Sequence, residues 1–241
     1  MKVLVLGHNG MLGNAVCKHL NSCSGFEILT IDSRWSTEDF VRSLLSFNGD
    51  YVINCIGAIP QKTTDFKINY ELPIWLDENV NCRVIHQDTD SWKEKDDYTL
   101  SKIKASNYLA LHGSRTKIIK TCVIGHGKDK VSLLDWFLNS NDEVFGYTEC
   151  YWNGNTTLQW SKICYKIMKD FNRYDTLNIP TSDCISKYDL LVIIKDVFGK
   201  QIEIEKNPTT NMNKCLVTTY DMPNINIKTQ LKELKEFYYD N

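Results

Sequence analysis

A glycine-rich turn close to the N-terminus constrains the fold of this chain more than any other feature. An apolar run at Lys2–Leu6 leads directly into GHNGMLG at residues 7–13, and a helical pattern follows. Glycine permits a tight turn and a close approach of backbone to phosphate, while a helix N-terminus offers unpaired N–H groups and a positive dipole. This strand–turn–helix order predicts a loop that binds the pyrophosphate of a dinucleotide.

Apolar strands and helices then alternate along the first half of the chain. The strands are continuously apolar, which suits a parallel sheet covered by helices on both faces. We therefore predict an α/β fold with a doubly wound parallel sheet, the Rossmann fold. The predicted strands are residues 2–6, 26–31, 51–56, 83–87 and 117–123, and the predicted helices are residues 14–20, 37–46, 73–79 and 98–111.

The final third of the chain is less regular. We expect helices at residues 133–138, 157–171 and 187–198 and strands at residues 176–179 and 201–205. The tail at residues 231–239 has the pattern of an amphipathic surface helix with no special role. We interpret the 241 residues as a single domain, in which a small C-terminal substrate lobe is formed mainly by residues 125–241.

Composition excludes several classes of partner. The formal net charge of -2 offers no general attraction for nucleic acid or for an anionic membrane. No apolar segment approaches the ~20 residues of a membrane helix, and the N-terminal run lacks the features of a signal peptide, so we expect a cytoplasmic protein. Nine cysteines without CxxC pairs predict small buried thiols in a reducing compartment. The five histidines show no ligand spacing, which predicts loop or surface positions and no metal site; His8 alone, inside the glycine turn, is placed to contact a cofactor.

Residues after the second and third strands bear on the identity of the cofactor. Asp32 ends the second strand, where a carboxylate accepts hydrogen bonds from the ribose hydroxyls of NAD. Ser33 and Arg34 follow, and an arginine there can hold the 2′-phosphate of NADP, so both NAD and NADP stay open. The third strand ends in NCIGA at residues 54–58, whose small residues let ribose and phosphate lie against the backbone.

Tyr98 and Lys102 predict a site of proton transfer, because four residues of helix place both side chains on one face. A free tyrosine has a pKa of about 10, and a neighbouring ammonium stabilises its phenolate, so the hydroxyl can exchange a proton with a carbonyl nearer neutral pH. Thr89 lies just beyond the strand at residues 83–87 and would orient the same carbonyl. Lys102 would also hold the nicotinamide ribose, and Asp96 or Asp97 is expected to cap the helix.

Taken in order, these motifs resemble the dTDP-4-dehydrorhamnose reductase family of the extended short-chain dehydrogenases/reductases. The similar segments are GHNGMLG, VINCIGAI, INYELP, VIHQDTD and YTLSK, followed by TCVIGH, LLDWFL, GYTECYWNGNTT and ISKYDLL. The resemblance covers nearly the whole chain. It implies an NAD(P)H-dependent reductase of a nucleotide-diphospho-4-keto-6-deoxysugar, in nucleotide-sugar and polysaccharide precursor biosynthesis, and it is compatible with a homodimer.

The resemblance also implies which residues form the site. Catalytic roles fall on Thr89, Tyr98 and Lys102, of which Thr89 and Tyr98 also contact the substrate. Cofactor positions fall on Gly7, Asn9, Gly10, Met11, Leu12 and Gly13, with further contacts from Asp32, Ser33, Arg34, Cys55, Gly57, Ala58, Asn69 and Lys102. The sugar-nucleotide region is similar in placement to Trp136, Trp152, Asn153 and Lys214.

Two departures from the resemblance bear on the expected site. The connection at residues 91–97 is shorter than the family's, which removes cover over the sugar and affects substrate scope or turnover. At ~3.3 Å per residue this connection still spans roughly 20 Å, so the geometry of the catalytic residues remains permitted. Asp88 stands where the family commonly has serine, which adds a negative charge near the reacting carbonyl.

Other functions stay open at this point. The same fold and cofactor suit a nucleotide-sugar epimerase or dehydratase, in which the nicotinamide is recycled and held tightly. The sequence has no obvious second acid/base pair next to Thr89, which argues against a dehydratase. A non-catalytic NAD(P)-binding regulatory subunit would agree with the short connection, although Tyr98 and Lys102 are both retained.

Overall fold

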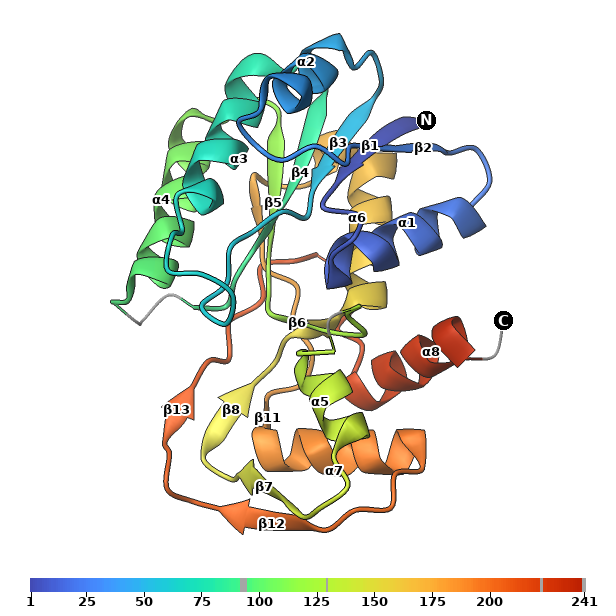
Figure 1. The fold of residues 1–241 in the computed structure, drawn as a ribbon, viewed down its shortest axis with the longest axis vertical. Helices are drawn as coiled ribbons and strands as arrows, with labels where there is room; N and C mark the ends of the chain where they lie inside the picture. The colour runs from blue at the N-terminus through green and yellow to red at the C-terminus, as the bar shows by residue number, and fades with distance from the viewer. Residues whose placement is uncertain (92–94, 129, 222, 240–241) are drawn as a thin grey trace. The chain divides into compact units, whose positions relative to one another are not determined.

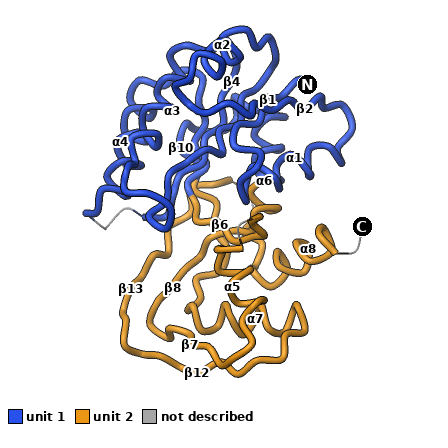
Figure 2. Tube along the Cα trace, viewed as in Figure 1, with its two compact units in different colours: residues 1–120, 161–178 blue, residues 121–160, 179–241 orange. Residues whose placement is uncertain are grey.

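The computed structural model describes residues 1–91, 95–128, 130–221 and 223–239. The chain divides into two compact units, which Figure 2 colours separately. Unit 1 comprises residues 1–120 and 161–178, and unit 2 comprises residues 121–160 and 179–241. Residues 161–178 of the predicted C-terminal lobe therefore belong to unit 1.

Unit 1 is built on a six-stranded sheet. The strand order is β10-β5-β4-β3-β1-β2, and every pairing in it is parallel. This topology confirms the predicted α/β fold with a doubly wound sheet. The strands are β1 (Lys2–Leu6), β2 (Glu27–Thr30), β3 (Tyr51–Asn54), β4 (Arg83–Asp88), β5 (Thr116–Lys120) and β10 (Leu177–Asn178).

Helices cover both faces of this sheet, and Figure 1 shows α1 on one side with α3 and α4 on the other. The helices of unit 1 are α1 (Met11–Ser22), α2 (Glu38–Ser46), α3 (Ile68–Asn79), α4 (Asp97–His112) and most of α6 (Thr157–Lys169), followed by a 3-10 turn at Phe171–Arg173. The predicted start of α3 at Pro73 is wrong. Proline suits the first turn of a helix, but here Pro73 lies inside a helix that begins at Ile68.

The apolar core of unit 1 explains why these elements pack as they do. Side chains from the sheet meet those of α2 and α3 in one cluster that includes Leu6, Phe40, Val52, Leu72 and Val84. Strand β2 is the exception to the expected coverage, since its residues are mostly exposed and it pairs with β1 alone among the described strands. It is therefore an edge strand.

The described residues of unit 2 form small sheets of two or three strands, together with three helices. Its strands are β6 (Val123–Ile124), β7 (Val144–Tyr147), β8 (Cys150–Trp152), β9 (Asn155–Thr156), β11 (Ile185–Ser186), β12 (Ile204–Asn207) and β13 (Met212–Asn213), paired as β11-β8-β13, β12-β7 and β6-β9. Its helices are α5 (Leu133–Asn139), α7 (Lys187–Phe198) and α8 (Ile227–Tyr239), together with the first residues of α6. The prediction for α7 agrees at both ends.

Helix α8 is part of the core of unit 2. Ile227, Leu231 and Leu234 are fully buried and pack in the same cluster as residues of α7. Gln230 is also fully buried; its Oε1 accepts from Thr156 N at 2.8 Å, and its Nε2 donates to Asn155 Oδ1 at 3.0 Å. The prediction of a surface helix with no special role is therefore wrong, because the helix begins four residues earlier than its apolar pattern suggested.

A disulfide joins Cys184 to Cys215 in unit 2. The prediction that all the cysteines are unpaired thiols is wrong for these two. They lie in loops, 31 residues apart in the sequence, so no local spacing of cysteines predicts the bond. The other seven cysteines are free, and burial raises the pKa of both Cys17 and Cys82 to about 11.

Neither a membrane span nor a metal cluster is found in the described parts of the chain. No helix there combines the length and the apolar character needed to cross a bilayer. No group of three or more histidine, cysteine, aspartate or glutamate side chains is arranged there to hold a metal ion.

Candidate active site

The glycine turn between β1 and α1 is shaped by direct backbone contact. Gly7 has a φ of +77°, a backbone conformation that residues other than glycine adopt rarely. A Cβ on Gly13 would lie 2.2 Å from the carbonyl oxygen of Gly7, so the first turn of α1 packs on the loop with no space for a methyl group. These two glycines are thus required by the fold of the loop itself.

The N-terminus of α1 is left available for a ligand. Gly10 is the N-cap residue and provides no side-chain cap. Nδ1 of His8 is buried and has no hydrogen-bond partner among the described residues. An uncapped helix N-terminus beside a buried, unpaired ring nitrogen is the donor set that an anionic pyrophosphate needs, so this loop fits a dinucleotide.

Asp32 lies within reach of the glycine turn. Its Oδ1 is 3.2 Å from His8 Nε2 and accepts from Asn9 Nδ2 at 3.5 Å, yet the side chain is 87% exposed. Arg34 is also exposed. The carboxylate and the guanidinium are therefore both accessible from solvent.

The loop after β3 is held by Asn69 of α3. Asn69 is fully buried; its Oδ1 accepts from Ala58 N at 2.8 Å, and its Nδ2 donates to Ala58 O at 3.0 Å and to Ser101 Oγ at 3.1 Å. Its amide is thus occupied in fixing the loop at Gly57 and Ala58. Desolvation raises the pKa of the neighbouring Cys55 thiol, which stays protonated.

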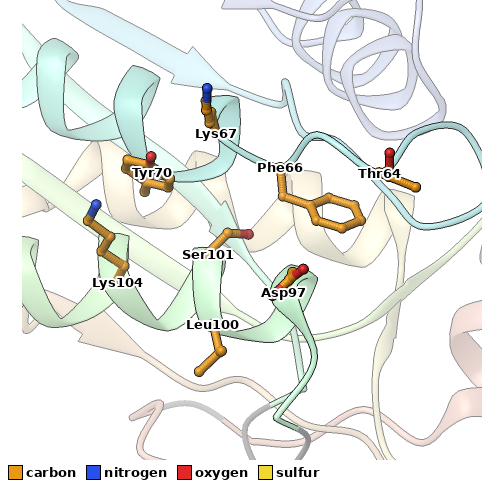
Figure 3. Close-up of a pocket in the computed structure, with 8 residues that line it drawn as sticks. All are labelled: Thr64, Phe66, Lys67, Tyr70, Asp97, Leu100, Ser101 and Lys104. Carbon is orange, nitrogen blue, oxygen red and sulfur yellow. The ribbon is translucent and has the colours of Figure 1, made fainter.

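Helix α4 begins at a defined residue and carries the tyrosine–lysine pair. Asp96 is its N-cap and accepts from Thr99 N at 2.8 Å, as expected. The half-buried ring of Tyr98 meets Phe66 edge-on, with ring centroids 5.7 Å apart. Figure 3 shows Phe66 beside Asp97 and Ser101 of α4, at a cavity of about 270 Å³. No pattern in the sequence indicated that Phe66 supports Tyr98.

Lys102 is buried one turn after Tyr98. Its side chain is only 3% exposed, and Nζ donates to Gln87 O at 3.3 Å. A Cβ on Gly57 would lie 3.4 Å from the same Nζ, so the ammonium reaches the loop after β3. Desolvation lowers the pKa of Lys102; the charge of Asp88 opposes this effect and that of Lys120 adds to it.

Thr89 lies at the carboxyl end of β4 and is 6% exposed. Its backbone N–H donates to Asp88 Oδ1 at 2.7 Å. Its hydroxyl donates to Asp90 Oδ1 and accepts from Ser91 N, both at 3.3 Å. The structure therefore brings Thr89 and Lys102 to the same end of β4, where Gln87 O accepts from Lys102 Nζ two residues before Thr89.

A polar cluster beneath this edge was not expected from the sequence. The prediction that His86 is a loop or surface residue is wrong, because it lies in β4, is 1% exposed and pairs with Asn54. Burial and the charge of Lys102 lower the pKa of His86 to about 3, so the ring is neutral. Asp88, Ser106 and Lys120 complete the cluster, and of these only Asp88 was indicated by the sequence, because it stands where the family commonly has serine.

Four of the six predicted substrate residues lie in unit 2, and they differ in accessibility. Trp136 on α5 is 44% exposed, and Lys214 is half-buried. Trp152 is 2% exposed within the apolar core. Asn153 is buried; its Nδ2 donates to Leu216 O at 2.8 Å and its Oδ1 accepts from Leu216 N at 3.0 Å. Trp152 and Asn153 thus have structural contacts, while the side chain of Trp136 is exposed to solvent.

Comparison with known protein sequences gives a match over part of the chain. No family model matches the chain. A curated relative, UDP-2-acetamido-2,6-beta-L-arabino-hexul-4-ose reductase from Pseudomonas aeruginosa, is 30% identical over 120 residues. The match includes 47% of this chain and 32% of the relative, so the chain spans about a third of the length of the curated protein it matches.

Solved structures match along the full length at low sequence identity. A dTDP-4-dehydrorhamnose reductase from Bacillus anthracis, in complex with NADP, has a TM-score of 0.77 at 11% identity, covering 100% of this chain and 99% of that one. A UDP-glucose 4-epimerase from Thermotoga maritima, with UDP-glucose, has a TM-score of 0.73 at 14% identity, covering 100% and 99%. The chain therefore has the fold that these reductases and epimerases share.

Proposed function

We propose that this chain is an NAD(P)H-dependent reductase that converts the keto group of a nucleotide-linked 4-keto-6-deoxysugar into an alcohol. The observation that carries the proposal is the position of Lys102. Its ammonium is buried at the carboxyl end of β4, one helical turn from Tyr98 and against the loop at Gly57. A lysine so enclosed is costly unless its charge is used.

In this proposal three side chains of unit 1 handle the carbonyl. Tyr98 gives its phenolic proton to the oxygen, and the positive charge of Lys102 lowers the cost of the phenolate left behind. Thr89 turns its hydroxyl from Asp90 to the carbonyl oxygen and orients it. Phe66 holds the ring of Tyr98 from the side.

The uncapped helix N-terminus at Gly10 and the loop at Gly57 hold the cofactor, which is NADP or NAD. When bound, the reduced nicotinamide supplies the hydride. Gly7 and Gly13 allow the tight turn and the close packing that shape the pyrophosphate loop, and the exposed Asp32 and Arg34 select between the two cofactors.

Unit 2 is proposed to bind the sugar nucleotide. Trp136 offers an exposed ring for stacking and Lys214 offers a cation for phosphate, while Asn153 keeps the segment that carries Lys214 in place through its bonds to Leu216. A cytoplasmic location and a homodimer belong to the same proposal. Seven free cysteines agree with a reducing compartment, whereas the Cys184–Cys215 bond does not.

The test is oxidation of NADPH or NADH in the presence of a panel of 4-keto-6-deoxysugar nucleotides. Tyr98→Phe is expected to lower kcat by about 10²–10⁴-fold, because the proton donor is lost, with the Kd of the cofactor unchanged. Tyr108→Phe is the matched control on the same helix, since the Tyr108 hydroxyl donates to Glu78 outside the site.

The outcomes separate the alternatives. Full activity of Tyr98→Phe would remove the proposed proton donor. Tightly bound oxidised cofactor with no net consumption of NADPH or NADH would favour an epimerase of the same fold. Cofactor binding without any turnover on the panel would leave the non-catalytic regulatory subunit.

A further inference from the structure

Asp88 and Lys120 form an ion pair inside unit 1. They are register partners on the neighbouring strands β4 and β5, so their side chains lie on the same face of the sheet. Asp88 is fully buried and Lys120 is 9% exposed, and Lys120 Nζ lies 3.0 Å from Asp88 Oδ2. Removing two charges from water costs free energy that an apolar pair would not, so the pair calls for an explanation other than stability.

The contacts of Asp88 tie together the parts of the proposed site. Its Oδ1 accepts from the backbone N–H of Thr89 at 2.7 Å. Its Oδ2 accepts from Ser106 Oγ at 2.6 Å, and Ser106 lies one turn beyond Lys102 on α4. One carboxylate therefore links the strand end that carries Thr89, the helix that carries Lys102, and β5 through Lys120.

Lys102 faces charged and titratable groups from three elements. His86 and Asp88 come from β4, Lys120 comes from β5, and Tyr98 lies one turn earlier on α4; α3 contributes the uncharged Asn69. His86 is neutral at physiological pH because burial and Lys102 lower its pKa. Asp88 and Lys120 are thus the two buried charges that act on the Lys102 ammonium, in opposite directions.

We propose that Asp88 and Lys120 are positioning residues of the site: the pair fixes the backbone at Thr89 and balances the charge around Lys102. The inference rests on the proposed function and deepens it. Asp88 alone would attract the ammonium away from the loop at Gly57, whereas the paired Asp88 leaves Lys102 Nζ on Gln87 O and beside Gly57. Lys120 supplies the compensating charge from the neighbouring strand.

The decisive measurement is the pH profile of kcat for Asp88→Asn and for Lys120→Met. Activity falls at high pH when Lys102 loses its proton. Asp88→Asn removes an attractive charge, so the alkaline limb is expected to move to lower pH by about one unit; Lys120→Met removes a repulsive charge, so the limb is expected to move to higher pH by a similar amount. A purely structural pair gives no reason for shifts of opposite sign.

Further variants separate charge from position. In the double variant Asp88→Asn/Lys120→Met, the alkaline limb of the pH profile is expected to return toward its wild-type position. Lys120→Arg keeps the positive charge, so its alkaline limb is expected to stay at the wild-type position. Asp88→Glu keeps the charge but displaces it from Thr89, so kcat is expected to fall with the limb unmoved. Lys117→Met is the matched control, because Lys117 lies on β5 and donates to Tyr174 O.

Thermal unfolding gives a readout that needs no turnover. Each single neutralisation leaves a buried charge unpaired and is expected to lower the Tm by about 6–20 °C, with recovery in the double variant. The pH dependence of the cofactor Kd should shift in the same two directions, since Lys102 is placed to hold the nicotinamide ribose.

These readouts distinguish the two proposals. A wild-type chain that turns over no substrate rejects the proposed function, and the pair is then judged by the unfolding cycle and by cofactor affinity. An active wild-type chain whose alkaline limb stays in place in both single variants rejects the positioning pair and leaves the reductase standing. If Asp88→Asn does not fold, Lys120→Met and Asp88→Glu still test whether the pair positions the site.

Discussion

Both units have an apolar core, and unit 1 in addition buries two lysines close to an aspartate. In unit 1, Asp88, Lys102 and Lys120 are enclosed beneath the carboxyl edge of the sheet, each with a hydrogen-bond or ionic partner. In unit 2, α7 and α8 enclose hydrocarbon, and Trp152 is the largest side chain among them. Burying a charge costs free energy, whereas burying apolar surface is favourable. Unit 1 therefore keeps charge where proton transfer is proposed, and unit 2 is stabilised by packing.

Among the changes that test this difference between the units, Lys102→Met should have the largest effect on activity. We expect kcat to fall by about 10²–10⁴-fold, because Tyr98 loses the cation that stabilises its phenolate. Stability should respond differently. A lysine whose folded-state pKa is lowered destabilises the fold at low pH, and this cost disappears as the pH rises from that lowered value through ~10.4, the value of the unfolded chain.

Lys102→Met is therefore expected to be at least as stable as the wild type at neutral pH, with the difference vanishing at high pH. Denaturant unfolding at several pH values, together with steady-state kinetics, measures both effects. A variant that is inactive because it is unfolded would contradict the idea that this lysine serves chemistry at a cost in stability.

For the tryptophans of unit 2 we expect that burial decides stability and that exposure decides substrate binding. Trp152→Ala should lower the free energy of unfolding by about 3–5 kcal/mol, because it opens a cavity in a packed core. Trp136→Ala, at an exposed position, should cost less than about 0.5 kcal/mol but raise the KM for the sugar nucleotide.

Trp152→Phe is the matched control, since Trp152 Nε1 has no hydrogen-bond partner in the described structure and a phenyl ring keeps most of the packing. Chemical denaturation gives the three stabilities. Equal destabilisation by Trp152→Ala and Trp136→Ala would show that the burial difference does not govern unit 2.

The disulfide provides a further contrast, since unit 2 has a covalent link and the described cysteines of unit 1 do not. Cys215→Ser should lower the stability of the oxidised protein by about 2–4 kcal/mol, because the bond restricts the unfolded chain. A reductant should lower the Tm of the wild type to that of the variant and leave the Tm of the variant unchanged. A wild-type Tm that ignores the reductant would argue that the bond does not form in solution.

The smallest expected effect concerns the cofactor. Asp32→Ala should shift the ratio of kcat/KM values toward NADPH by about tenfold, because the carboxylate repels a 2′-phosphate; Arg34→Ala should shift it toward NADH by a similar factor. Kinetics with both reduced cofactors measures the ratios. Parallel losses for both cofactors would show that these residues do not select between them.

Local sequence signals found the motifs of unit 1 but not the long-range contacts of either unit. The strand–glycine–helix order and the spacing of Tyr98 and Lys102 depend on neighbouring residues, so local motifs and their order along the chain located them. The bond between Cys184 and Cys215 joins distant loops, and no local pattern encodes it. The core role of Gln230 was hidden for the same reason, since its partners Asn155 and Thr156 lie far away in the chain.

By itself the sequence determined the α/β class, the glycine turn and the helical face shared by Tyr98 and Lys102, because backbone geometry sets each of these over a few residues. Only the tertiary structure decided that His86 is buried, that Asp88 forms an ion pair with Lys120, and that Trp152 lies inside a core. Burial and charge pairing depend on which strands and helices become neighbours, and that arises from contacts across long stretches of chain.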